Sequence, residues 1–257
     1  MHHKPLSQIQ SNFQNINTVQ PYQGNVILHN IIRYQGTFLM SQEMTLWHAS
    51  FTQEDVHVTQ TTPAYQGHYQ IYQYQLKHKC FNGDWSPILE REHLVRDDAT
   101  GVLLYDIEQD KVVLIEQFRV GPLTHKSSPW LLEIPAGLNE GERPEEVAIK
   151  EVLEETGLTI HRPTLIGEFY TTPGAFSEKI TLYYAPVDSS AAKGVHGLAH
   201  EGEDIKVVVL GFDEVQELMN SNWVTSASTI IALQWLTLHR TRLRQNVTCL
   251  EKNDISV

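Results

Sequence analysis

The chain has 257 residues, 41% of them hydrophobic, which suits one ordinary domain with a smaller appended unit. Its formal net charge of −12 argues against a nucleic-acid or membrane partner, because binding to those anionic surfaces relies on clustered Lys and Arg. Its two cysteines, Cys80 and Cys249, are far apart, and no apolar stretch has the length of a membrane span or the core of a signal peptide, so we expect a cytoplasmic protein without disulfides.

In chain order, residues 1–53 come first and are rich in Gln and Asn, and we interpret them as an N-terminal extension of unknown role. Residues 54–98 contain short alternating segments such as HYQIYQYQL and the turn pair Asn82-Gly83, which predict a small antiparallel β-sheet. From 99 to 257, the segments VLLYDI and KVVLIEQFRV predict strands joined by the turn 108–110. Two helices are predicted near the C-terminus, at Phe212–Met219 and Ser228–Arg244.

The segment GLNEGERPEEVAIKEVLEETGL, residues 137–158, predicts a short helix that begins at Pro144 and ends at Gly157. Its carboxylates Glu151, Glu154 and Glu155 fall within an arc of about 100°, so we expect an acidic stripe open to solvent. A separate apolar arc is expected to pack on a core and consists of Ala148, Ile149, Val152 and Leu153.

Like charges at the spacing of Glu151 and Glu155 destabilise a helix by roughly 0.2–0.5 kcal/mol, and a divalent cation such as Mg²⁺ would remove that penalty. An ordinary amphipathic helix with a solvated acidic face is the alternative interpretation. A second acidic stretch, HEGED, ends the polar segment 188–203, directly before the apolar run IKVVVL. Long polar segments in compact domains are commonly functional or disordered, and the residues alone favour a solvated acidic loop.

Residues 137–158 resemble the Nudix box, G-x5-E-x7-R-E-U-x-E-E-x-G-U with U aliphatic. The matching positions are Glu142, Glu151, Val152, Glu154, Glu155, Gly157 and Leu158. The loop between Gly137 and Glu142 is one residue shorter than the pattern, and Lys150 replaces an arginine, which keeps the charge but not the planar fork of donors. The runs EQFRVG, PWLLEIPAG, TTPGAFSEKI, GVHGLAHEGEDIKV and SASTIIALQWL extend the resemblance to the ADP-ribose pyrophosphatase branch.

This resemblance implies an α+β Nudix fold for residues 99–257, with a mixed sheet between helices. The small N-terminal β-sheet domain, residues 54–98, would be exchanged between the subunits of a homodimer. The implied reaction is Mg²⁺-dependent hydrolysis of the pyrophosphate bond of ADP-ribose to AMP and ribose 5-phosphate, with Mn²⁺ as an alternative cofactor. Hydrolysis of other nucleoside diphosphate sugars and a non-catalytic ADP-ribose-binding regulator stay open as alternatives.

The resemblance also implies roles for individual residues. Metal would be held by Glu151, Glu155, Glu203 and the carbonyl of Ala136, with Glu154 alongside as a second catalytic carboxylate. Glu201 would activate the attacking water.

The resemblance further implies substrate contacts by Arg119, Arg91, Tyr65 and Glu178, with Arg91 and Tyr65 acting on the partner's site. The residues alone favour a surface ion pair of Arg119 with Glu116 and of Arg91 with Glu92, and plain packing for Tyr65. Glu90 stands where the family often has an arginine, which predicts weaker or rearranged nucleotide binding.

Overall fold

The computed structural model describes residues 47–125 and 128–253, with side chains as far as 245, and four two-residue strands before them. These strands form two antiparallel pairs, β1 (Ile27–Leu28) with β4 (Met44–Thr45) and β2 (Arg33–Tyr34) with β3 (Thr37–Phe38). Most of the predicted extension 1–53 therefore lies outside the described residues. The chain divides into two compact units, residues 1–57 with 77–87, and residues 58–76 with 88–257.

The predicted small β-sheet is present. It consists of β5 (Val56–Gln66), β6 (Gln70–His78) and β7 (Leu89–Val95), in that order. Between β6 and β7 the chain turns at Asn82-Gly83 as expected, with Gly83 at φ +91°. All eleven residues of β5 are exposed to solvent. None of its side chains therefore belongs to the buried core of the described residues.

The second sheet has eight strands, β8 (Ala99–Asp106), β9 (Lys111–Phe118), β10 (Trp130–Glu133), β11 (Ala136–Leu138), β12 (Thr164–Tyr170), β13 (Lys179–Pro186), β14 (Val195–His196) and β15 (Ile205–Gly211). The strand order is β12-β13-β8-β9-β15-β14, with β10 added beside β9 and β11 beside β8. β13 runs parallel to β8, and the other described pairs are antiparallel. The sheet is thus mixed, as predicted.

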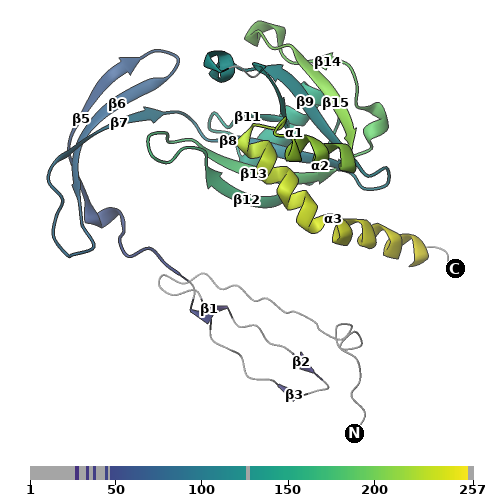
Figure 1. Cartoon of the computed structure of the whole chain (residues 1–257), viewed down its shortest axis with the longest axis horizontal. Coiled ribbons are helices and arrows are strands. Elements are labelled where there is room, and N and C mark those ends of the chain that lie inside the picture. Colours follow the sequence, from purple (N-terminus) through teal and green to yellow (C-terminus); the bar gives the residue numbers. More distant parts are fainter. Residues whose placement is uncertain are drawn as a thin grey trace. The chain divides into compact units, whose positions relative to one another are not determined.

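Helices pack on both faces of this sheet, and Figure 1 shows α1, α2 and α3 beside its strands. Successive side chains of a strand point to opposite faces, and both faces of β8 and β9 are apolar. On one face Val102, Leu104 and Val113 pack with Ala148 and Val152 of α1 (Pro144–Thr156). On the other face Leu103, Tyr105, Val112 and Leu114 pack with α2 (Phe212–Asn220) and α3 (Ala227–Asn253).

The predicted α+β architecture with a mixed sheet between helices is confirmed. The two C-terminal helices begin within a residue of their predicted starts, and α3 continues to Asn253 instead of ending at Arg244. No helix among the described residues is both long enough and apolar enough to cross a membrane.

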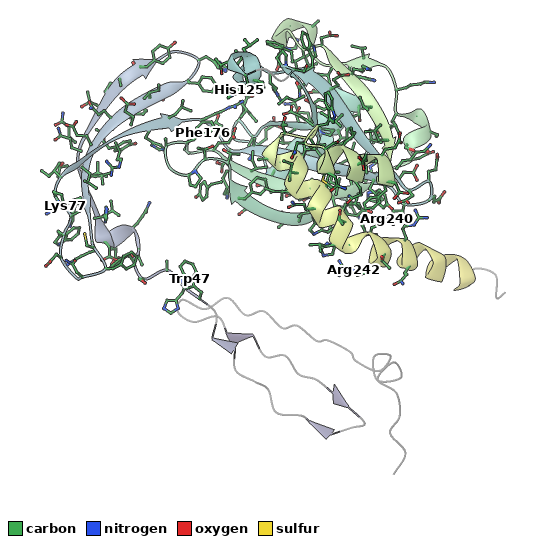
Figure 2. All side chains as sticks on the ribbon, in the orientation of Figure 1. Trp47, Lys77, His125, Phe176, Arg240 and Arg242 are labelled. Atoms are coloured by element: carbon green, nitrogen blue, oxygen red, sulfur yellow. The ribbon has the colours of Figure 1, made fainter. Side chains whose placement is uncertain are left out.

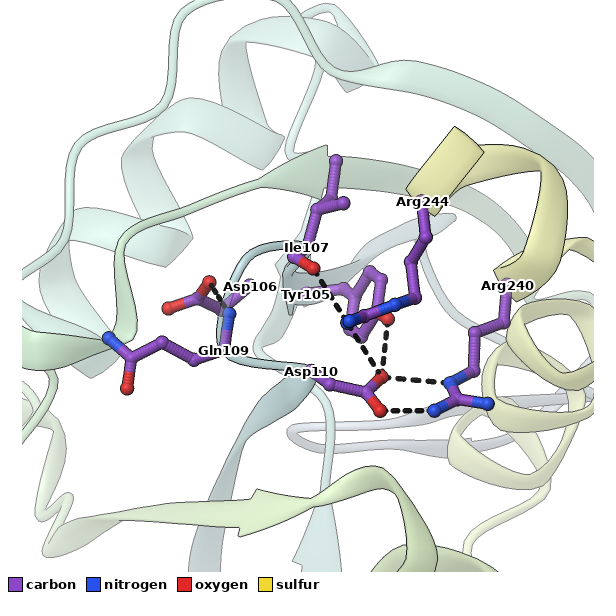
Figure 3. Close-up of polar contacts among 7 residues, drawn as sticks. All are labelled: Tyr105, Asp106, Ile107, Gln109, Asp110, Arg240 and Arg244. Atoms are coloured by element: carbon purple, nitrogen blue, oxygen red, sulfur yellow. Dashed lines mark hydrogen bonds and ion pairs between the residues drawn. The ribbon is translucent and has the colours of Figure 1, made fainter. Parts of the chain in front are cut away.

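A partly buried cluster of ion pairs around Asp110 joins helix α3 to the β8–β9 turn (Figure 3). Asp110, in a left-handed conformation at φ +57°, accepts hydrogen bonds from the Tyr105 hydroxyl at 2.6 Å and from Arg240 Nε at 2.8 Å. Its second oxygen accepts from Arg240 Nη2, which completes a two-pronged contact. Arg244 lies 3.4 Å from Asp110 and also donates to the carbonyl of Ile107. Figure 2 shows Arg240 on α3 among the side chains that the structure describes.

Replacing Asp110 with Asn is expected to lower the free energy of unfolding by about 1–2 kcal/mol, discounted for partial solvent exposure. The hydrogen bond and charge of Arg240 lower the pKa of Asp110 below its ordinary 3.8. A lowered folded pKa gives stability that is present above the unfolded pKa and is lost as the pH falls through the folded value. Urea unfolding should therefore show a difference in the free energy of unfolding between wild type and variant that is constant from pH 7 to pH 5. This difference should become smaller below about pH 4. The exposed turn residue Glu108, changed to Gln, is the matched control, and a difference independent of pH would contradict the assignment.

Candidate active site

Helix α1 begins and ends where the sequence indicates. Pro144 is its first residue, Glu145 and Glu146 occupy the first turn, and Gly157 ends it at φ +70°. The predicted apolar arc is wrong at one position, because Leu153 is 52% exposed, whereas Val147 is buried. Leu153 lies about 100° round the helix from Val152, on the side away from the sheet.

Glu155 is buried and does not belong to a stripe open to solvent, so the expectation of a fully solvated acidic face was wrong for this residue. It is 2% exposed, and its Oε2 accepts a hydrogen bond from the N–H of Ala136 at 2.9 Å. Burial raises the pKa of Glu155 well above its ordinary value, the Ala136 N–H opposes this, and the charges of Glu151 and Glu203 add to it. An unneutralised carboxylate in this position strongly favours the approach of a cation.

Glu151 lies beside it, over the backbone of β11. Burial raises the pKa of Glu151 to about 7; Lys150 opposes the shift, and Glu154, Glu203 and Glu201 contribute to it. Lys150 Nζ lies 3.6 Å from Glu142 and 3.9 Å from Glu151, so the lysine at the family's arginine position contacts two box carboxylates.

Gly137 on β11 leaves room for the carboxylate of Glu151 in this position, since a Cβ here would overlap it. Gly137→Ala is therefore expected to displace Glu151 and to weaken divalent-metal affinity by about tenfold or more. Isothermal titration with Mg²⁺ measures the change. Gly167→Ala is the control, because a Cβ there meets no atom within 4 Å. Equal metal affinity of the Gly137 variant and wild type would show that the glycine does not serve the site.

The polar segment after β13 returns to the same helix. It contains the short turns Ser189–Ala191 and Ala199–Glu201 with β14 between them. The N–H of Gly197 donates to the carbonyl of Glu154 at 3.2 Å, and the N–H of Leu198 donates to Glu203 Oε2 at 2.9 Å. Glu201 remains mostly exposed, with its carboxylate 3.5 Å from His200 Nε2. The segment thus brings Glu203 and Glu201 close enough to raise the pKa of Glu151.

The described residues contain no ready-made group of three or more His, Cys, Asp or Glu side chains that could hold a metal ion. Their chemistry nevertheless fits a hard divalent cation. Carboxylate oxygens are the ligands that Mg²⁺ prefers, and the described part of the chain shows no ion pair between Glu155 and any Lys or Arg. A cation would relieve the burial and mutual repulsion that raise the pKa values of Glu151 and Glu155.

Arg119, at the end of β9, pairs with Glu133 and not with the expected Glu116. Its Nε lies 2.9 Å from Glu133 Oε2, which also accepts from Gln117 Nε2 at 3.2 Å. Glu116 pairs instead with Lys206 across the β9–β15 ladder. The sequence reasoning missed Glu133, although a buried carboxylate inside the apolar run WLLEI is a signal that could have identified it.

The other predicted substrate residues lie outside the carboxylate group. Tyr65 is 57% exposed on β5, and Arg91 on β7 donates to the carbonyl of its neighbour Glu90 at 2.7 Å. Glu178 is buried and pairs with Arg96 at 3.3 Å while accepting from the Thr171 hydroxyl. In the part of the chain that the structure describes, none of these three side chains bonds to a box carboxylate.

Residues 95–243 match the family described as the NUDIX domain, more than half of the chain. The chain belongs to the Nudix family. Among its Nudix relatives, an ADP-ribose pyrophosphatase from Haemophilus influenzae is 39% identical over 200 residues, covering 76% of this chain and 92% of the relative. An ADP-ribose pyrophosphatase from Escherichia coli is 37% identical over 196 residues, covering 76% and 94%. A GDP-mannose pyrophosphatase from Cronobacter sakazakii is 36% identical over 150 residues, covering 58% and 78%.

Proposed function

We propose that this Nudix protein hydrolyses the pyrophosphate bond of ADP-ribose, in a Mg²⁺-dependent reaction that yields AMP and ribose 5-phosphate. The observation that carries the proposal is that the charge of Glu203, on a segment distant in sequence, helps to raise the pKa values of Glu151 and Glu155 of α1, and that the charge of Glu201 adds to the effect on Glu151. The ADP-ribose pyrophosphatases that match 76% of this chain support this choice of substrate.

Hydrolysis of a diphosphate needs charge neutralisation on the phosphoryl oxygens, an aligned water and a base. Bound Mg²⁺ would supply the first and would be held by Glu151, Glu155, Glu203 and the carbonyl of Ala136, with Glu154 alongside. Glu201 would accept the proton of the water, since its exposed carboxylate lies on the segment that joins the metal site. Mn²⁺ has the same preference for oxygen ligands and would replace Mg²⁺.

Substrate recognition follows from the cations and aromatic groups around this centre. Arg119 would bind phosphate through the guanidinium nitrogens that do not contact Glu133. Glu178, which pairs with Arg96, would order its own loop at the substrate. Arg91 and Tyr65 would reach the site of a second subunit, because all of β5 is exposed to solvent and a homodimer would cover it. We assign the activity to the cytoplasm, in keeping with a chain that has only two, widely separated cysteines.

The proposal is tested by incubating the full chain with ADP-ribose and Mg²⁺ and measuring AMP by chromatography. AMP release that stops with EDTA and resumes with added Mg²⁺ is the expected result. Comparing the hydrolysis rates of ADP-ribose, ADP-glucose and GDP-mannose decides the substrate class. GDP-mannose is the main alternative substrate, because one relative is a GDP-mannose pyrophosphatase. Binding of ADP-ribose without AMP release would overturn hydrolysis and support a regulator.

A further inference from the structure

The ring of His196, on β14, packs on the glycine that ends α1. Gly157 has φ +70°, and a methyl group on it would lie 2.8 Å from His196 Cε1, closer than Cβ atoms approach other carbons. Glycine is therefore needed here for the contact as well as for the left-handed backbone. The imidazole occupies the space that a side chain at position 157 would fill.

Hydrogen bonds hold the ring and its strand in this position. His196 Nε2 lies 2.9 Å from the carbonyl oxygen of Lys193, which can only accept, so Nε2 carries the hydrogen. The following N–H, that of Gly197, donates to the carbonyl of Glu154. That carbonyl lies in the last turn of α1, where backbone oxygens lack partners within the helix.

The carboxylate of Glu203 is linked to the same contact. Glu203 Oε2 accepts from the N–H of Leu198 at 2.9 Å, and the N–H of Glu203 donates to the carbonyl of Leu198 at 3.3 Å. Leu198 directly follows Gly197, so a shift of β14 relative to α1 would move Glu203 with it. Glu201 lies between Leu198 and Glu203 in the sequence, at the end of the short turn Ala199–Glu201.

We propose that His196 is a positioning residue, which packs on Gly157 and thereby sets the distance between the carboxylates of residues 197–203 and those of α1. The inference rests on the proposed function in one respect: the distance matters because Glu203 and Glu155 would bind the same cation. In this role His196 acts through the backbone of Gly197 and Leu198, which bonds to Glu154 and to Glu203. With a smaller side chain at position 196, the carboxylates of residues 197–203 would no longer be held at a fixed distance from those of α1.

The first test measures hydrogen–deuterium exchange in the metal-free full chain. His196→Ala is expected to raise exchange of the amides at 197 and 198 by about tenfold, because their local opening becomes easier. His161→Ala, at an exposed histidine shortly after the same helix, is the matched control and should leave these amides unchanged. Exchange across β8 and β9 should also stay at the wild-type rate, which shows that the fold is intact.

The second test is a double-mutant cycle of Gly157→Ala and His196→Ala, read by exchange and by ADP-ribose kinetics. In the wild-type background the added methyl should displace the imidazole and lower kcat about tenfold with KM unchanged. In the His196→Ala background the same methyl should lower kcat less than about twofold. The strain of alanine in the left-handed conformation is common to both backgrounds and cancels, so the difference reports the ring contact.

An additive cycle, or unchanged exchange at 197 and 198 in His196→Ala, would overturn the positioning role. The exchange measurement uses neither metal nor substrate, so it stays decisive if the protein does not hydrolyse ADP-ribose. Conversely, normal AMP release by the wild type with wild-type exchange in the variant would reject the inference and leave the proposed function intact.

Discussion

Replacing Glu201 with Gln is expected to lower kcat by about 10²- to 10⁴-fold, the usual contribution of a general base. The change keeps the size and the hydrogen-bonding oxygen of the side chain but removes the group that accepts the proton. Glu201 lies on the exposed side of the turn, whereas Glu203 bonds to Leu198, so the substitution should leave the metal ligands in place.

Two further measurements make this prediction specific. The increase in melting temperature produced by Mg²⁺ should be the same in wild type and Glu201→Gln, because metal that binds the folded state stabilises it by mass action. Glu108→Gln, an exposed glutamate of the β8–β9 turn, should retain full kcat. An unchanged kcat in Glu201→Gln would place the base on another residue, and loss of the Mg²⁺ effect would make Glu201 a ligand.

Replacing Glu155 with Gln is expected to have opposite effects on the metal-free and the metal-bound protein. Without metal, the variant should be as stable as wild type or more stable, since it removes a carboxyl group whose burial raises its pKa, while its amide oxygen can still accept from Ala136. With Mg²⁺ the wild type should gain about 2.7 kcal/mol at one hundred times the dissociation constant, and the variant should gain almost nothing. Its kcat/KM should fall by about 10³-fold.

The pH dependence of the metal-free proteins supplies an independent check. Burial raises the folded pKa of Glu155 above the ordinary 4.5, so the unfolded state loses its proton first and wild-type stability declines as the pH rises above that value. Glu155→Gln should show less of this decline between about pH 5 and pH 8. Thermal unfolding at several pH values, each with EDTA and with Mg²⁺, measures both effects. A variant that is less stable than wild type in EDTA would show that Glu155 serves the fold and not a cation.

The sequence was sufficient to predict features that depend on local chemistry. Pro144 and Gly157 delimit α1 because the first requires no N–H and the second tolerates positive φ, and both requirements are local. The apolar runs of β8 and β9 predict strands that are buried on both faces.

Features that depend on strand register could not be predicted in this way. Arg119 bonds to Glu133 because β10 pairs with β9 with Glu133 opposite Ile115, and Glu116 bonds to Lys206 because these two residues are directly opposed. The burial of Glu155 has the same origin, since it depends on how closely Ala136 of β11 approaches the helix. Helical periodicity places a carboxylate on a face but does not identify what covers that face.

The candidate catalytic residues and the larger stabilising cluster lie on opposite faces of the eight-stranded sheet. The carboxylates gather on the α1 face, whereas the larger apolar cluster and the Asp110–Arg240 contact lie with α2 and α3 on the opposite side. Substitutions beneath α3 can therefore be selected for heat tolerance while the geometry of catalysis is left alone. A protein engineer would begin a thermostable version of this chain on that opposite side.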